Sequence, residues 1–170
     1  MQNKEKMIKN RRFWSTAIIA WIVFIGIDFF FHASLLESLW KEEIDSIKPE
    51  MDLFILIPVG YLSFLLLTLL VGYSFIKIFQ TKPDRIKVLK FSLIFGLLYS
   101  VSNLLAVYSY INIPLKQLII MNSVYFIEIS AVVFIFYKAV YRKKINRILL
   151  YSILVFFTLV IVGIIVQNIN

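Results

Sequence analysis

The chain has 170 residues, of which 61% are hydrophobic and 16% are charged, and its formal net charge is +8. Soluble domains have about 45–50% apolar and about 25% charged residues, so this composition excludes an ordinary soluble domain. The chain has no cysteine, which excludes disulfide scaffolds, thiol catalysis and cysteine-ligated zinc. The positive charge does not indicate nucleic acid binding, because the basic residues lie beside long apolar runs, where membrane insertion and anionic lipid account for them.

Residues 1–12 form a basic leader before the first apolar run, 13–36. This run is too long for the apolar region of about 7–15 residues in a signal peptide, and no cleavage signal follows it. We therefore expect an uncleaved first span.

Residues 35–48 have apolar side chains on one helical face and charged ones on the other, which predicts a short helix on the membrane surface that ends at Pro49. A partly ordered acidic loop is the alternative.

Four further apolar runs predict the remaining spans, each close to the roughly 20 residues that cross a hydrocarbon core. They are 53–79, interrupted early by Pro58, then 91–113, 118–141 and 148–166. The sequence therefore predicts an all-α membrane protein with a single transmembrane domain over residues 1–170. This domain is a bundle of five transmembrane helices, with a short interfacial amphipathic helix after the first.

The lysines and arginines alternate along the chain. Five precede the first span, five lie in 77–90 and five in 138–147, whereas the intervening segments contain two, one and none. This alternation requires an odd number of spans. The positive-inside rule then places the N-terminus in the cytoplasm and the C-terminus outside, in a multi-pass protein of the cell membrane.

Two acidic residues, Asp28 and Glu128, lie within predicted spans, and the single histidine, His32, lies one helical turn after Asp28. An ionised carboxylate near the bilayer centre costs at least about 2.5–3.5 kcal/mol, so such residues normally face the protein interior or water. No lysine or arginine lies at a comparable depth. We therefore expect each carboxyl group to be able to hold a proton near neutral pH.

Counting 1.5 Å per residue from the midpoint of each span places most of the embedded polar groups in the outer half of the membrane. The candidate ligand- or proton-binding residues are Asp28, His32, Tyr61, Asn103, Asn122, Tyr125 and Glu128. Each also has a purely structural interpretation. Asn103 is expected to join two helices by a hydrogen bond, and Asp28 with His32 could form a hydrated helix end.

Small residues at helical spacing predict close contacts between spans. In the third span Ser92, Gly96 and Ser100 lie four residues apart, within a longer seam that continues through Tyr99, Asn103, Ala106 and Tyr110. In the second span the corresponding stripe contains Tyr61, Leu65, Thr68 and Gly72. The fifth span is almost uniformly apolar, so we expect it to be the most exposed to lipid.

Asp28, His32 and Glu128, together with Glu37, are chemically suited to zinc or manganese. However, the chain has one histidine, and its only ligand-like spacing is i, i+4, so the metal signal is weak. Nucleotide-binding, zinc-protease and nucleophile-elbow motifs are absent. The sequence therefore predicts no cofactor and no catalytic residue.

The leading hypothesis is a non-enzymatic integral membrane protein with an outward-facing polar pocket that binds a small solute, proton or cation for transport or sensing. One alternative is an accessory or structural subunit without chemistry. Another is a membrane-embedded enzyme that acts on lipid through Asp28, His32 and Glu128. The expected partners are membrane lipids, including anionic inner-leaflet lipid beside the basic segments, and a small ligand or ion. The sequence is also compatible with an oligomer or with a partner subunit.

Five spans and an Asp–His turn in the first of them also suggest a family resemblance. In this form the chain resembles the small multi-span membrane proteins of bacteria and archaea that have no assigned function. The resemblance covers the whole chain, but it implies no activity.

Overall fold

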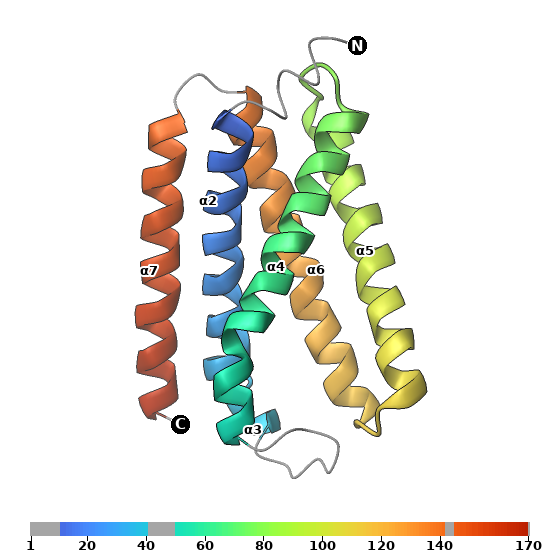
Figure 1. The fold of residues 1–170 in the computed structure, drawn as a ribbon, viewed down its shortest axis with the longest axis vertical. Coiled ribbons are helices and arrows are strands. Elements are labelled where there is room, and N and C mark those ends of the chain that lie inside the picture. Colours follow the sequence, from blue (N-terminus) through green and yellow to red (C-terminus); the bar gives the residue numbers. More distant parts are fainter. Residues whose placement is uncertain (1–10, 41–49, 142–144, 170) are drawn as a thin grey trace.

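The computed structural model describes residues 11–40, 50–141 and 145–169, and within these ranges the regular elements are all helices. Five of the helices are long and apolar enough to span a membrane (Figure 1). The predicted all-α bundle of five transmembrane helices is therefore confirmed. The elements are α2 (Arg11–Asp28), the π-helix η1 (Phe29–Leu35), α3 (Glu37–Trp40), α4 (Glu50–Ile78), α5 (Arg85–Tyr110), α6 (Leu115–Tyr141) and α7 (Ile145–Ile169).

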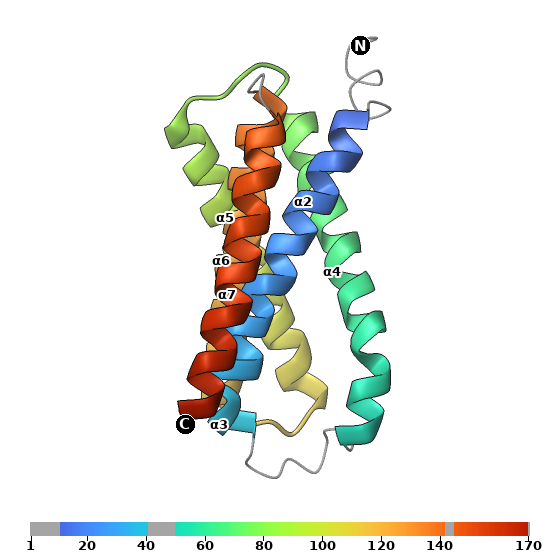
Figure 2. The ribbon, with the colours of Figure 1, turned by 90° about the vertical axis from the view of Figure 1, so that its left-hand side faces the viewer.

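The spanning helices run in alternating directions along the bundle. α2 begins at one end of the bundle and α7 ends at the other (Figures 1 and 2). The α4–α5 connection lies at the end where α2 begins, and the α5–α6 turn lies at the opposite end. The five helices therefore alternate in direction, which is the arrangement that the distribution of lysine and arginine predicts.

All five spanning helices begin before the apolar runs that predict them, and α5 shows the largest difference. α5 begins at Arg85 instead of residue 91, and α6 begins at Leu115 instead of residue 118. At the start of α5, the Asp84 side chain accepts a hydrogen bond of 2.8 Å from the Lys87 backbone N–H. This bond also holds the pKa of the Asp84 carboxyl group below its usual value. A capped helix start needs no apolar side chains, so the helix extends beyond its apolar run.

The predicted interruption at Pro58 is wrong, because α4 is helical without a break from Glu50 to Ile78. Proline lacks a backbone N–H, so it removes one hydrogen bond from a helix. In lipid, a break in the helix would leave further backbone groups without partners, which is costly, and the helix therefore continues on both sides of Pro58.

Only part of the predicted surface helix over 35–48 can be compared with the structure. Leu35 ends η1 and residues 37–40 form α3, whereas residues 41–49 lie outside the described residues.

α6 is the central helix of the bundle. It packs against α2, α4 and α5, and 39% of its apolar 18-residue membrane-spanning stretch is buried inside the protein. The corresponding share for α7 is 11%, the lowest of the five spans, as the uniformly apolar sequence of this helix predicts. The core between α2, α4 and α6 contains three fully buried rings, those of Phe24, Phe75 and Phe136.

Small residues allow the closest helix contacts, as predicted. On α5, Ser92, Gly96 and Ser100 are buried, and a Cβ added at Gly96 would lie 2.8 Å from the Phe126 ring of α6. The C-terminal end of the predicted α5 seam is not packed, since Tyr110 is 72% exposed. The last helix makes a similar contact with η1, where a Cβ added at Gly163 would lie 2.7 Å from Ser34 Oγ and 3.1 Å from the Phe29 ring.

Candidate functional site

The segment that carries His32 is a π-helix. It follows α2 directly, and near its end the Leu36 N–H donates a 2.8 Å hydrogen bond to the carbonyl of Phe31, five residues earlier. Turns of this width are rare inside helices and are frequent at functional sites. The sequence carries no signal for this feature, because a run of apolar residues has the same composition in an α-helix and in a π-helix.

Asp28 and His32 lie on the two sides of the junction between α2 and η1. The distance between His32 Nε2 and Asp28 Oδ1 is 3.9 Å, which is too long for a hydrogen bond. The two groups therefore form an ion pair only when the imidazole is protonated. Their side chains remain 18% and 20% exposed. This pair is thus mostly enclosed by protein but is still reached from the surface.

Glu128 lies near the middle of α6, and none of its surface is exposed. Within the described part of the chain, neither of its carboxylate oxygens has a hydrogen-bond partner. An ionised carboxylate that is buried and unpaired costs several kcal/mol in desolvation. The position therefore suits a neutral carboxylic acid, or a carboxylate that has bound a cation.

Tyr125, one turn before Glu128 on α6, joins the two acidic positions. It interacts electrostatically with both Asp28 and Glu128, and these two carboxyl groups also interact with each other. The Tyr125 ring centroid lies 6.4 Å from that of His32 and 6.0 Å from that of Tyr99, which it meets edge-on. The sequence predicted Tyr99 as a packing residue of α5 and not as a site residue. Its position beside Tyr125 is therefore seen only in the structure.

Tyr61 reaches the same cluster from α4. It interacts electrostatically with Asp28, and its backbone carbonyl accepts a 2.7 Å hydrogen bond from the Trp21 indole of α2. This bond fixes α4 against α2 beside Asp28. The structure thus places the acidic cluster, defined as Asp28, His32, Tyr61, Tyr99, Tyr125 and Glu128, at the meeting of α2, η1, α4, α5 and α6.

The two asparagines among the predicted site residues bond to each other. Asn103 Nδ2 donates a 3.0 Å hydrogen bond to Asn122 Oδ1, and Asn122 Nδ2 donates one of 2.7 Å to the Leu118 carbonyl. Asn122 also lines a shallow cavity of about 260 Å³ between α5 and α6. This pair joins two helices, which is the structural interpretation that the sequence allows for Asn103.

Among the residues that the structure describes, no group of three or more acidic or histidine side chains could hold a metal ion. The weak metal hypothesis for Asp28, His32 and Glu128 therefore has no support from the geometry.

Comparison of the chain with known protein families, characterised proteins and solved structures found no match. The acidic cluster can accept, hold and pass protons, since it combines two carboxyl groups, an imidazole and three tyrosine hydroxyls.

Proposed function

We propose that this integral membrane protein binds protons at the acidic cluster, and that Glu128 is the group that holds the proton inside the membrane. The observation that carries the proposal is the complete burial of Glu128, with both carboxylate oxygens unpaired within the described residues. Ionisable residues at such depth commonly mark proton or ion pathways. Asp28 supports this assignment, because one proton bound to the pair removes the repulsion between two neighbouring carboxylates.

Exposure decreases from one side of the cluster to the other. Asp28 and His32 keep about a fifth of their side-chain surface exposed, whereas Glu128 has none. Tyr125 interacts with both carboxyl groups, and its hydroxyl can donate and accept a hydrogen bond. A proton would therefore enter at Asp28 or His32 and reach Glu128 by way of Tyr125.

We assign the end of the bundle where α2 begins to the cytoplasm, because the basic connections lie there. The chain has no cysteine, so single-cysteine variants report the orientation directly. In intact cells a membrane-impermeant maleimide should label Ser109→Cys, near the end of α5, and should label Thr81→Cys only after the cells are opened. The reverse labelling pattern would invert the orientation and place the acidic cluster toward the cytoplasm.

Dicyclohexylcarbodiimide tests the proton site, because this apolar reagent reacts with protonated carboxyl groups that water does not reach. In the purified protein we expect labelling at Glu128, measured by peptide mass spectrometry, and we expect it to fall as the pH rises. Glu128→Gln should reduce the total labelling at least about tenfold. Asp52→Asn, at an exposed position near the start of α4, should label like the wild type.

Two outcomes would contradict proton binding at Glu128. One is an absence of label on Glu128 at every pH, and the other is labelling that does not depend on pH. Protection by sodium or potassium ions at constant pH would identify a small cation as the ligand in place of the proton. Proton uptake by vesicles that contain the protein, measured with an internal pH-sensitive dye, then separates transport from sensing.

A further inference from the structure

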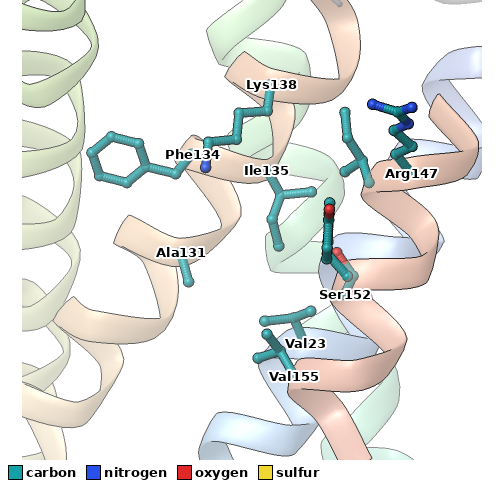
Figure 3. A pocket seen from close by; sticks show the side chains of 10 residues that line it. Val23, Ala131, Phe134, Ile135, Lys138, Arg147, Ser152 and Val155 are labelled. Atoms are coloured by element: carbon teal, nitrogen blue, oxygen red, sulfur yellow. The ribbon is translucent and has the colours of Figure 1, made fainter. Parts of the chain in front are cut away.

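A second feature, remote from the acidic cluster, is a groove where α2, α6 and α7 meet. α7 packs mainly against α2 and η1 and makes few contacts with α6. Along this side a cavity of about 700 Å³ remains, which lies within the range of about 300–1,000 Å³ that is typical of ligand sites. Its apolar wall includes Val23, Ala131 and Val155, one from each helix (Figure 3).

The groove has a cationic end and an apolar end. Figure 3 shows Lys138 of α6 and Arg147 of α7 toward one end of the cavity, and Val23 and Val155 toward the other. Both basic side chains are exposed, and no carboxylate of the described residues forms a salt bridge with either. In the sequence, Arg142, Lys143 and Lys144 stand between these two basic residues.

The occupant must match both ends. A soluble anion would leave the apolar wall without a partner, and a neutral lipid would leave the two cations without one. An anionic phospholipid satisfies both, because its phosphate pairs with lysine and arginine and its acyl chain covers apolar side chains. The groove also opens at the surface that faces lipid in a membrane-spanning chain, since Phe134 and Tyr151, which line it, are exposed.

We propose that the groove between α6 and α7 binds one anionic phospholipid, whose phosphate contacts Lys138 and Arg147 and whose acyl chain lies against Val23, Ala131 and Val155. This site is independent of the acidic cluster. It also differs from general attraction of basic segments to an anionic membrane surface, because it requires two particular cations and a particular apolar wall.

Native mass spectrometry of the delipidated, detergent-solubilised full chain tests this proposal. The protein is titrated with phosphatidylglycerol and with phosphatidylcholine of the same acyl chains. We expect tighter binding of phosphatidylglycerol by the wild type, and a loss of roughly thirtyfold in the double variant Lys138→Gln/Arg147→Gln. The control Lys82→Gln/Lys90→Gln removes the same charge from exposed positions at the same end of the bundle and should bind like the wild type.

Three further results decide the remaining points. Ala131→Trp, which fills the apolar part of the groove without changing any charge, should also weaken binding of phosphatidylglycerol; an unchanged affinity would overturn the assignment of the acyl chain. Equal losses in the two double variants would show general electrostatic attraction and no local site. Competition by inorganic phosphate or glycerol phosphate at similar concentrations would show a soluble-anion site instead of a lipid site.

Discussion

Replacing Glu128 with methionine is expected to raise the thermal stability of the protein while removing its reaction with carbodiimide. A buried polar group without a hydrogen-bond partner costs about 1–3 kcal/mol, and Glu128 has no partner for either oxygen within the described residues. Methionine has a similar volume and is flexible enough to fill the same space in the core of the bundle. The free energy of unfolding should therefore increase by about 1–3 kcal/mol.

Gln117 provides the matched control, because it is also a buried polar residue of α6 but donates a 2.8 Å hydrogen bond to the Leu39 carbonyl. Gln117→Met should lower stability by about 1 kcal/mol, since that carbonyl loses its donor. Thermal unfolding of both variants in one detergent measures the two signs. If Glu128→Met is destabilised as well, Glu128 holds helices together, and the interpretation of the protein as a structural subunit is favoured.

Gly72→Ala is expected to destabilise the protein by about 1–3 kcal/mol, the usual cost of overpacking a core. Gly72 of α4 faces the Phe136 ring of α6, and a Cβ at this position would lie 2.5 Å and 2.6 Å from two of its ring carbons. The ring cannot easily move away, because it is fully buried and its centroid lies 5.8 Å from that of Phe13. The two helices would have to separate.

The same helix contains the control for this substitution. No heavy atom lies within 4 Å of a Cβ added at Gly60, so Gly60→Ala should be neutral, or stabilising by up to about 1 kcal/mol through its greater helix propensity. The comparison of both variants by thermal unfolding separates packing from backbone effects. Similar midpoints for Gly60→Ala and Gly72→Ala would contradict the close approach of α4 and α6.

The apolar runs were sufficient to predict the five helices, because only long helices can satisfy their backbone groups in lipid. The ends of the helices were less predictable, since the Asp84 cap extends α5 through polar sequence. The stripe of Ser92, Gly96 and Ser100 predicted the contact face of α5, because only small side chains allow helices to approach so closely.

The acidic cluster could be predicted in part. Counting residues along a span gives the depth of a side chain but not its neighbours, so Asn103 was predicted as a site residue and Tyr99 only as a packing residue. In the structure Asn103 bonds to Asn122, and Tyr99 meets Tyr125. The π-helix could not be predicted, because an apolar run has the same composition in an α-helix and in a π-helix.

The π-helix also determines which side chains at the end of the first span face α7. A π-helical turn contains one residue more than an α-helical turn, so the side chains beyond it are rotated by about 100° relative to a continuous α-helix. That rotation brings Ser34 against Gly163 of α7. Ser34 and Gly163 are both buried at this contact, so a larger side chain at position 163 would displace the turn that carries His32.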